Sequence, residues 1–150
     1  MKDGEAEELF DKGLKAFREG NLPSALSFFE RASGIDPCPR NNSYLAYFIA
    51  RERGQIKKAI ELCREAIEKE PDNTALYLNM GRVYLLARQK EDAILAFREG
   101  LSRGQNQEII DELNGFGARR KPAFSFLSRA HPVNKCLGFI LSRLGSGNER

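Results

Sequence analysis

Few residues of this 150-residue chain are of the types that carry out catalysis or bind metal ions. The single histidine, His131, has no acidic neighbour in sequence to orient it as a general base. The three cysteines, Cys38, Cys63 and Cys136, form no CxxC pair and have no histidine at metal-ligand spacing. Gly115-Phe116-Gly117 lacks the preceding strand of a phosphate-binding glycine loop. We therefore expect a protein that is not an enzyme and that uses no metal or other cofactor.

Composition limits where the chain would work. An odd number of widely spaced cysteines is typical of free thiols in a reducing compartment. The first eight residues are polar and acidic, unlike the basic start and apolar stretch of a signal peptide. No apolar run approaches the roughly 20 residues that a membrane-spanning helix needs. We expect a cytoplasmic protein.

The elements that would position a binding site repeat every 34 residues. Such a repeat is considered first, because missing it leads to a wrong fold assignment. Small residues, large apolar residues and turn residues recur in the same register. Cys63 departs from its series, in which the other members are phenylalanine, and we expect it to occupy the same core position. The main series are Gly13, Tyr47 and Gly81; Ala25, Ala59 and Ala93; Leu26, Ile60 and Ile94; Phe29, Cys63 and Phe97; and Ala32, Ala66 and Gly100.

Each repeat has the pattern of two helices joined by a short turn. In the first repeat, Gly20-Asn21 interrupts the helical spacing before Pro23, which is tolerated at the start of a helix. Asp36-Pro37 then disfavours further helix. Gly13 and the alanines of the repeat allow two helices to approach closely, and Phe29 fills the remaining space. The pattern predicts a stack of helical hairpins.

This spacing resembles the tetratricopeptide repeat family, whose pattern is Trp-x2-Leu-Gly-x2-Tyr, then Ala-x3-Phe, then Pro. The predicted units are 6–39, 40–73 and 74–107. The resemblance implies an all-α fold, a right-handed superhelical α-solenoid of helix-turn-helix repeats with a C-terminal capping helix. The third unit matches best, with Tyr77, Met80, Gly81, Tyr84, Ala93 and Phe97 at family positions.

The segment after the third unit is expected to close the array. Residues 107–114 have the spacing of a short helix that ends at Gly115. Its apolar residues Ile109, Ile110 and Leu113 would cover the last hairpin. We therefore divide the chain into an array at 1–114 and a tail at 115–150, packed on the array and frayed at 145–150.

In the resembled fold, the first helix of each pair lines a concave groove that binds a peptide of another protein. Eight of the twelve residues in the corresponding columns are large and apolar, which is typical of an interaction surface. In the alternative, some of them, Phe17 and Leu85 especially, pack between neighbouring hairpins. The groove residues are Phe10, Asp11, Leu14, Phe17, Tyr44, Leu45, Phe48, Arg51, Leu78, Asn79, Arg82 and Leu85.

One subset of the family holds the C-terminal carboxylates of chaperones with Lys, Asn and Arg in these columns. The present chain has Phe10, Leu14, Leu45, Ala75 and Asn79 at those places, so the clamp is absent. An apolar groove instead predicts a partner that supplies a helical or extended apolar peptide. Arg82 and Asn79 would orient one end of that peptide.

The tail differs in charge from the array. Residues 1–112 contain 17 Lys and Arg against 20 Asp and Glu, whereas residues 115–144 contain six cations and no acid. Three interpretations stay open: an additional helix capped by Asn134 that docks on the array, a nucleic-acid-binding segment, and a segment that binds an anionic membrane surface. The basic tail patch comprises Arg119, Arg120, Lys121, Arg129, Lys135 and Arg143.

Overall fold

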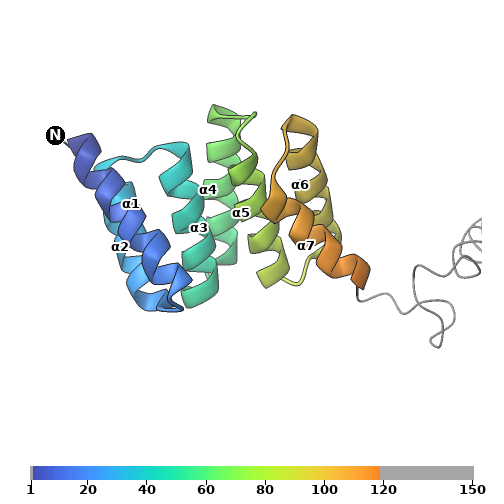
Figure 1. The fold of residues 1–150 in the computed structure, drawn as a ribbon, viewed down its shortest axis with the longest axis horizontal. Coiled ribbons are helices and arrows are strands. Elements are labelled where there is room, and N and C mark those ends of the chain that lie inside the picture. Colours follow the sequence, from blue (N-terminus) through green and yellow to red (C-terminus); the bar gives the residue numbers. More distant parts are fainter. Residues whose placement is uncertain (1, 119–150) are drawn as a thin grey trace, which may run out of the picture. The chain divides into compact units, whose positions relative to one another are not determined.

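A computed structural model describes residues 2–118 of the chain, and within this range every regular element is an α-helix (Figure 1). The all-α solenoid predicted from the 34-residue repeat is confirmed. Residues 1–111 form one compact unit that contains the first six helices and the start of the seventh. The helices are α1 (Lys2–Arg18), α2 (Leu22–Ile35), α3 (Pro39–Arg53), α4 (Ile56–Lys69), α5 (Thr74–Leu86), α6 (Lys90–Arg103) and α7 (Gln107–Ala118).

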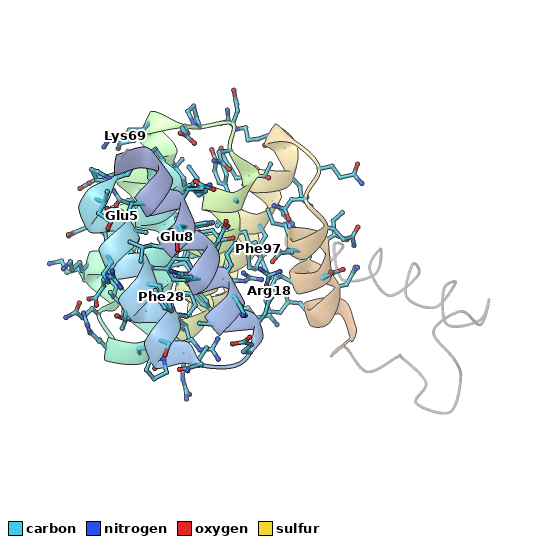
Figure 2. All side chains as sticks on the ribbon, turned by 60° about the vertical axis from the view of Figure 1, so that its left-hand side comes forward. Glu5, Glu8, Arg18, Phe28, Lys69 and Phe97 are labelled. Carbon is cyan, nitrogen blue, oxygen red and sulfur yellow. The ribbon has the colours of Figure 1, made fainter. Side chains whose placement is uncertain are left out.

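The first six helices form three hairpins that follow one another along the array. Helix α1 packs on α2, α3 on α4, and α5 on α6. Successive hairpins join through contacts of α2 with α3, of α3 with α5 and of α4 with α5. We call α1, α3 and α5 the inner layer, and α2, α4 and α6 the outer layer. Exposed charged residues such as Glu8 and Arg18 cover the surface, whereas Phe97 is buried between helices (Figure 2).

The turns inside the hairpins use the left-handed backbone region. Gly20 has φ +76° and Gly54 has φ +66°, a conformation that costs glycine little. Arg88 stands at the same place in the third repeat and has φ +61°, which costs a residue with a Cβ about 1–2 kcal/mol. Asn21 then begins α2 by accepting a hydrogen bond from the Ser24 N–H at 3.3 Å. The predicted break at Gly20-Asn21 is confirmed.

The hairpin crossings show why small residues recur. A Cβ placed on Gly13 would lie 2.8 Å from the Phe29 ring, and one on Gly81 would lie 2.2 Å from the Phe97 ring. Both distances are far below van der Waals contact, so the backbone of one helix rests against the aromatic ring of the other. Glycine is therefore required at these crossings while phenylalanine faces it.

The second hairpin reaches the same packing with different residues. Tyr47 stands at the glycine place, and Cys63 stands at the phenylalanine place. Since a Cβ at this place would strike a phenylalanine ring, a tyrosine at 47 requires a smaller residue opposite it. Cys63 is fully buried, as expected, and burial raises the pKa of its thiol to about 12.

Helix α7 covers the end of the third hairpin through its first turns. The Asn106 side chain accepts a hydrogen bond from the Ile109 N–H at 3.2 Å. Ile109 is fully buried against Gly100 and Tyr77, so its predicted capping role is confirmed. The predicted end at Gly115 is wrong, because α7 continues to Ala118. Glycine lowers helix propensity by about 1 kcal/mol but causes no clash that would end a helix.

Two further expectations concern membrane-spanning helices and the residues after Ala118. Among residues 2–118, no helix is both long and apolar enough to cross a membrane. The basic tail patch, Asn134, His131 and Cys136 lie outside the described residues. The division of the chain at residues 114 and 115 stays a prediction.

Candidate functional site

The twelve predicted groove residues divide into three groups by exposure. Asp11 and Arg51 are exposed. Six side chains are half-buried, and the remaining four are buried. The half-buried group is Leu14, Phe17, Tyr44, Leu45, Arg82 and Leu85, and the buried group is Phe10, Phe48, Leu78 and Asn79.

Phe48 belongs to the core and not to a groove surface. Its side chain is 0% exposed. Its ring centroid lies 5.2 Å from that of Phe17, 5.0 Å from Phe29 and 5.2 Å from Tyr47. These contacts join the first hairpin to the second. The assignment of Phe48 to an exposed groove is therefore wrong, because the inner layer uses this ring to hold two repeats together.

Phe10 is withdrawn from the surface in the same way. Its ring packs edge-on against Phe29 and Tyr44, with centroid distances of 5.5 and 5.0 Å. The guanidinium of Arg40 lies 4.0 Å above the same ring and is hydrogen-bonded to Glu7 of α1. Phe10 is therefore covered on both sides, and its assignment as a groove residue is wrong.

Leu78 and Asn79 of α5 are both buried, so neither lines an exposed groove as predicted. The Asn79 amide donates a hydrogen bond to the Ser43 hydroxyl at 3.0 Å. That hydroxyl in turn donates to the Arg40 carbonyl at 3.0 Å. Asn79 therefore fixes the register of two helices, and the prediction that it orients a peptide is wrong.

Four of the half-buried residues do converge, on a cavity of about 290 Å³ that we call the inner pocket. They come from three different repeats, Leu14 and Phe17 from α1, Tyr44 from α3 and Arg82 from α5. The inner pocket therefore depends on the stacking of all three hairpins. Its full lining is Leu14, Phe17, Arg18, Tyr44, Arg82 and Glu108.

The charged groups of the inner pocket are two guanidiniums and one carboxylate, and the Tyr44 hydroxyl is a further polar group. Arg82 donates to the Glu108 carboxylate at 3.1 Å, and the two side chains are 16% and 62% exposed. Burial, followed by the negative charge of Glu108, raises the pKa of the Tyr44 hydroxyl. Tyr44 therefore keeps its proton at neutral pH. The lining combines an apolar wall with net positive charge, from Arg18 and Arg82 against Glu108.

One more cation, Arg51, extends the positive character of the inner layer. Arg51 donates a hydrogen bond to the Tyr47 hydroxyl at 2.7 Å. The guanidiniums of Arg51 and Arg82 lie 5.9 and 5.8 Å from the centre of the Tyr47 ring. Aromatic rings attract cations at such distances, so the Tyr47 ring keeps both arginines close to it.

The pocket has the groups of a binding site. Its side chains offer apolar contact, hydrogen-bond donors and charge. Within the described part of the chain, no three His, Cys, Asp or Glu side chains are grouped as metal ligands would be.

The family's sequence profile, described as tetratricopeptide repeat, matches residues 50–113. This chain is a tetratricopeptide repeat protein. Its repeats are 32% identical over 91 residues to DnaJ homolog subfamily C member 7 of Mus musculus, covering 56% of this chain and 18% of that protein. They are 28% identical over 93 residues to the TPR repeat-containing protein YpiA of Bacillus subtilis, covering 61% and 22%. The chain thus spans about a fifth of the length of these relatives.

Solved structures show the same fold. The first TPR domain of Spaghetti, bound to an HSP90 peptide, superposes with a TM-score of 0.61 and 22% identity, covering 77% of this chain and 95% of that one. The TPR domain of Arabidopsis OM64 gives a TM-score of 0.62 and 18% identity, covering 80% and 100%. At these identities the similarity establishes the fold of this tetratricopeptide repeat protein.

Sequence reasoning missed two residues of the inner pocket, Arg18 and Glu108. Arg18 lies one turn after Leu14 on α1, so the helical spacing that selected Leu14 could also have selected it. Glu108 lies on α7, outside the repeat columns, and no signal within a single repeat indicates that it reaches Arg82. The tetratricopeptide pattern identifies residues of the hairpins and gives no information about the segment that follows them.

Proposed function

We propose that this tetratricopeptide repeat protein is a non-catalytic protein-interaction module that binds a helical or extended apolar peptide of a partner protein in the inner pocket. The observation that carries the proposal is the convergence of Leu14, Phe17, Tyr44 and Arg82 from three repeats on one cavity. An apolar side chain of the peptide would contact Leu14 and Phe17. The hydrogen-bonding groups would orient the peptide backbone.

The ion pair between Arg82 and Glu108 suggests where a polar group of the peptide would lie. Glu108 is largely exposed, and an exposed pair contributes only about 0–1 kcal/mol. A carboxylate or carbonyl of the partner could therefore replace Glu108 at little cost. Arg82 itself is held in place by the ring of Tyr47, so its guanidinium keeps a fixed orientation.

Peptide binding is also the recorded behaviour of structural neighbours. The Spaghetti domain binds the HSP90 peptide SRMEEVD, and the TPR2B domain of yeast Sti1 forms a complex with pHsp70. The present chain has Leu14 and Leu45 at places where the carboxylate clamp has polar residues. Its Asn79 is buried. We therefore propose a peptide of apolar character, distinct from the acidic chaperone terminus.

The test is to select peptides on the full chain from a displayed random library and to measure their binding by fluorescence anisotropy. Leu14→Gln should weaken the selected apolar peptides about tenfold, since it removes apolar contact worth about 1–2 kcal/mol. Arg82→Gln should weaken those that carry a carboxylate, while Glu108→Gln should strengthen them.

Two controls decide the outcome. Lys15→Gln, an exposed change on the same helix as Leu14, should leave binding unchanged. The peptide SRMEEVD should bind no better than a scrambled peptide. Selected peptides that bind the wild type, Leu14→Gln and Arg82→Gln equally well would overturn the proposed site.

The alternative function, binding of nucleic acid or an anionic membrane surface, rests on Arg119, Arg120, Lys121, Arg129, Lys135 and Arg143. All of these lie outside the described residues, and this function stays a prediction.

A further inference from the structure

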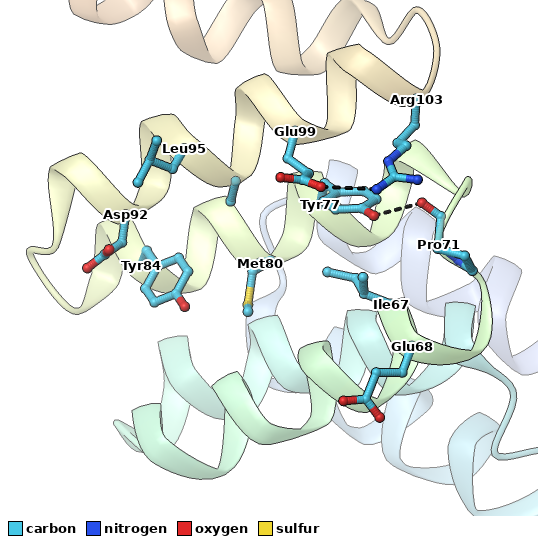
Figure 3. A pocket seen from close by; sticks show the side chains of 11 residues that line it. Ile67, Glu68, Pro71, Tyr77, Met80, Tyr84, Asp92, Leu95, Glu99 and Arg103 are labelled. Atoms are coloured by element: carbon cyan, nitrogen blue, oxygen red, sulfur yellow. Dashed lines mark hydrogen bonds and ion pairs between the residues drawn. The ribbon is translucent and has the colours of Figure 1, made fainter.

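A second cavity, of about 500 Å³, is lined by residues of α4, α5 and α6 and by Pro71 of the turn after α4. We call it the outer groove. It follows α5 between α4 and α6, which both pack on α5 (Figure 3). Met80 lies in its middle, between Tyr84 and Ile67, while Glu68 and Leu95 stand on opposite walls (Figure 3). No residue of the outer groove belongs to the inner pocket.

The outer groove has an exposed apolar side chain, Leu95, beside apolar residues that belong to the core or pack against it. Leu95 is 62% exposed. Among residues 2–118, Leu86 is the only other large apolar side chain that is exposed. Met80 is 7% exposed and lines the groove between Tyr84 and Ile67 (Figure 3), and Met side chains adapt to varied apolar ligands. An exposed leucine beside a methionine-lined hollow is typical of an interaction surface.

The charges around this apolar surface are mainly negative. Glu68, Asp92 and Glu99 line the groove with one cation, Arg103, which gives a net charge of −2. Arg103 is already hydrogen-bonded to Glu99 at 3.1 Å and lies 3.6 Å from Asp72. Within the described residues, Glu68 and Asp92 take part in no ion pair. Two carboxylates are therefore available to a cation of a partner.

The position of these two carboxylates suggests how a partner would lie. Asp92 is at the end of the groove beside Tyr84, and Glu68 is on the α4 wall (Figure 3). Met80 lies between the two carboxylates, and Leu95 lies on the α6 wall above Asp92 (Figure 3). A ligand that satisfies both features has an apolar centre and a cation on each side.

We propose that the outer groove docks a short basic segment of a partner protein, with a bulky apolar residue over Met80 and Leu95 and flanking Lys or Arg side chains toward Glu68 and Asp92. This surface is additional to the inner pocket. Because the inner pocket is net positive and the outer groove net negative, the two would select partners of opposite charge. One chain could then hold two proteins at once.

The experiment uses the chain's methionines as reporters. The sequence has two, so protein labelled with ¹³C at the methionine methyl group gives two signals, from Met1 and Met80. Met80→Leu assigns them. The full chain is titrated with the acetylated tetrapeptide amide KFLK and, as the matched control, with EFLE. We expect KFLK to shift the Met80 signal saturably and EFLE to leave it unchanged at the same concentrations.

Variants then locate the binding. The double variant Glu68→Gln, Asp92→Asn should weaken KFLK about fivefold, since it removes two exposed charge pairs of about 0.5 kcal/mol each. Leu95→Ala should weaken it by roughly fivefold to tenfold through lost apolar contact. All three residues are exposed, so unfolding should not change. Arg82→Gln in the inner pocket should leave KFLK binding unchanged, which separates this proposal from the proposed function.

Several outcomes would overturn the proposal. Equal shifts with KFLK and EFLE would show apolar binding without charge selection. No shift of Met80, or a shift that Leu95→Ala does not affect, would place any binding elsewhere. A Met80 signal that moves with protein concentration alone would identify a second copy of the chain as the occupant.

Discussion

The inner pocket and the outer groove use apolar residues differently. In the inner layer, the large residues of the predicted groove mainly hold repeats together, and only Leu14, Phe17 and Tyr44 reach the pocket as apolar lining. In the outer groove, Leu95 is 62% exposed, while Met80 belongs to the core. With three hairpins, an array has few residues with which to join its repeats, so the inner layer serves stability and binding together. Binding and stability should therefore be separable at the outer groove and coupled at the inner layer.

The largest expected effect tests this coupling at Phe48. Phe48→Ala removes a fully buried ring that contacts Phe17, Phe29 and Tyr47, and it should lower the free energy of unfolding by about 3–5 kcal/mol. Leu95→Ala is the matched change at the outer groove and should stay within about 0.5 kcal/mol of wild type. Urea unfolding followed by helical circular dichroism measures both. Similar losses in the two variants would remove the difference between the regions.

The second expected effect concerns the seam where an inner helix crosses an outer helix. Gly81→Ala raises helix propensity, yet its Cβ would lie 2.2 Å from the Phe97 ring, so we expect a net loss of about 1–3 kcal/mol. Gly34→Ala is the control, since nothing lies within 4 Å of its added Cβ in α2, and it should stabilise the protein by about 0.4–1 kcal/mol. The same urea midpoints report both changes. A stabilised Gly81→Ala variant would mean that the two layers are loosely packed.

The repeat period predicts the hairpins because it records contacts made within each repeat. Gly13 with Phe29, Gly81 with Phe97 and the turn at Gly20 all follow from residues fewer than 34 positions apart. Exposure of the inner layer depends instead on contacts between repeats. A column of large residues looks the same in sequence whether it faces a ligand or the next hairpin, so Phe10 and Phe48 were misassigned.

The outer groove escaped prediction for a related reason. Its exposed residues Glu68, Asp92 and Leu95 lie at places where the family pattern has no fixed residue. Tyr77, Met80 and Tyr84, which also line it, are pattern residues and gave no sign of a second surface. Leu95 in particular follows no column of the repeat. Its exposure becomes visible only when α4 and α6 are placed on α5. Surfaces built from variable positions of several repeats need the assembled array before they can be recognised.

The smallest expected effect tests whether water is excluded from the inward face of the outer layer, as it is from Phe48 in the inner layer. Cys63 of α4 is fully buried, and burial raises the pKa of its thiol from 9.0 to about 12. In the unfolded chain this thiol loses its proton near pH 9, whereas in the folded chain it keeps the proton until about pH 12. Its contribution to stability is therefore complete below pH 9 and declines as the pH rises toward 12. At pH 10 the loss should be about 1.4 kcal/mol relative to pH 8.

Comparing wild type with Cys63→Ala at both pH values isolates this thiol, because every other titrating group is common to the two proteins. The alanine variant leaves a small cavity at any pH but has no thiol to ionise. The destabilisation caused by Cys63→Ala should therefore shrink by about 1.4 kcal/mol between pH 8 and pH 10, as measured by urea unfolding. A difference that stays constant would show that the thiol ionises equally in the folded and unfolded chains. Water would then reach Cys63 on the inward face of α4. The outer layer would then lack the difference between a buried face at Cys63 and an exposed face at Leu95.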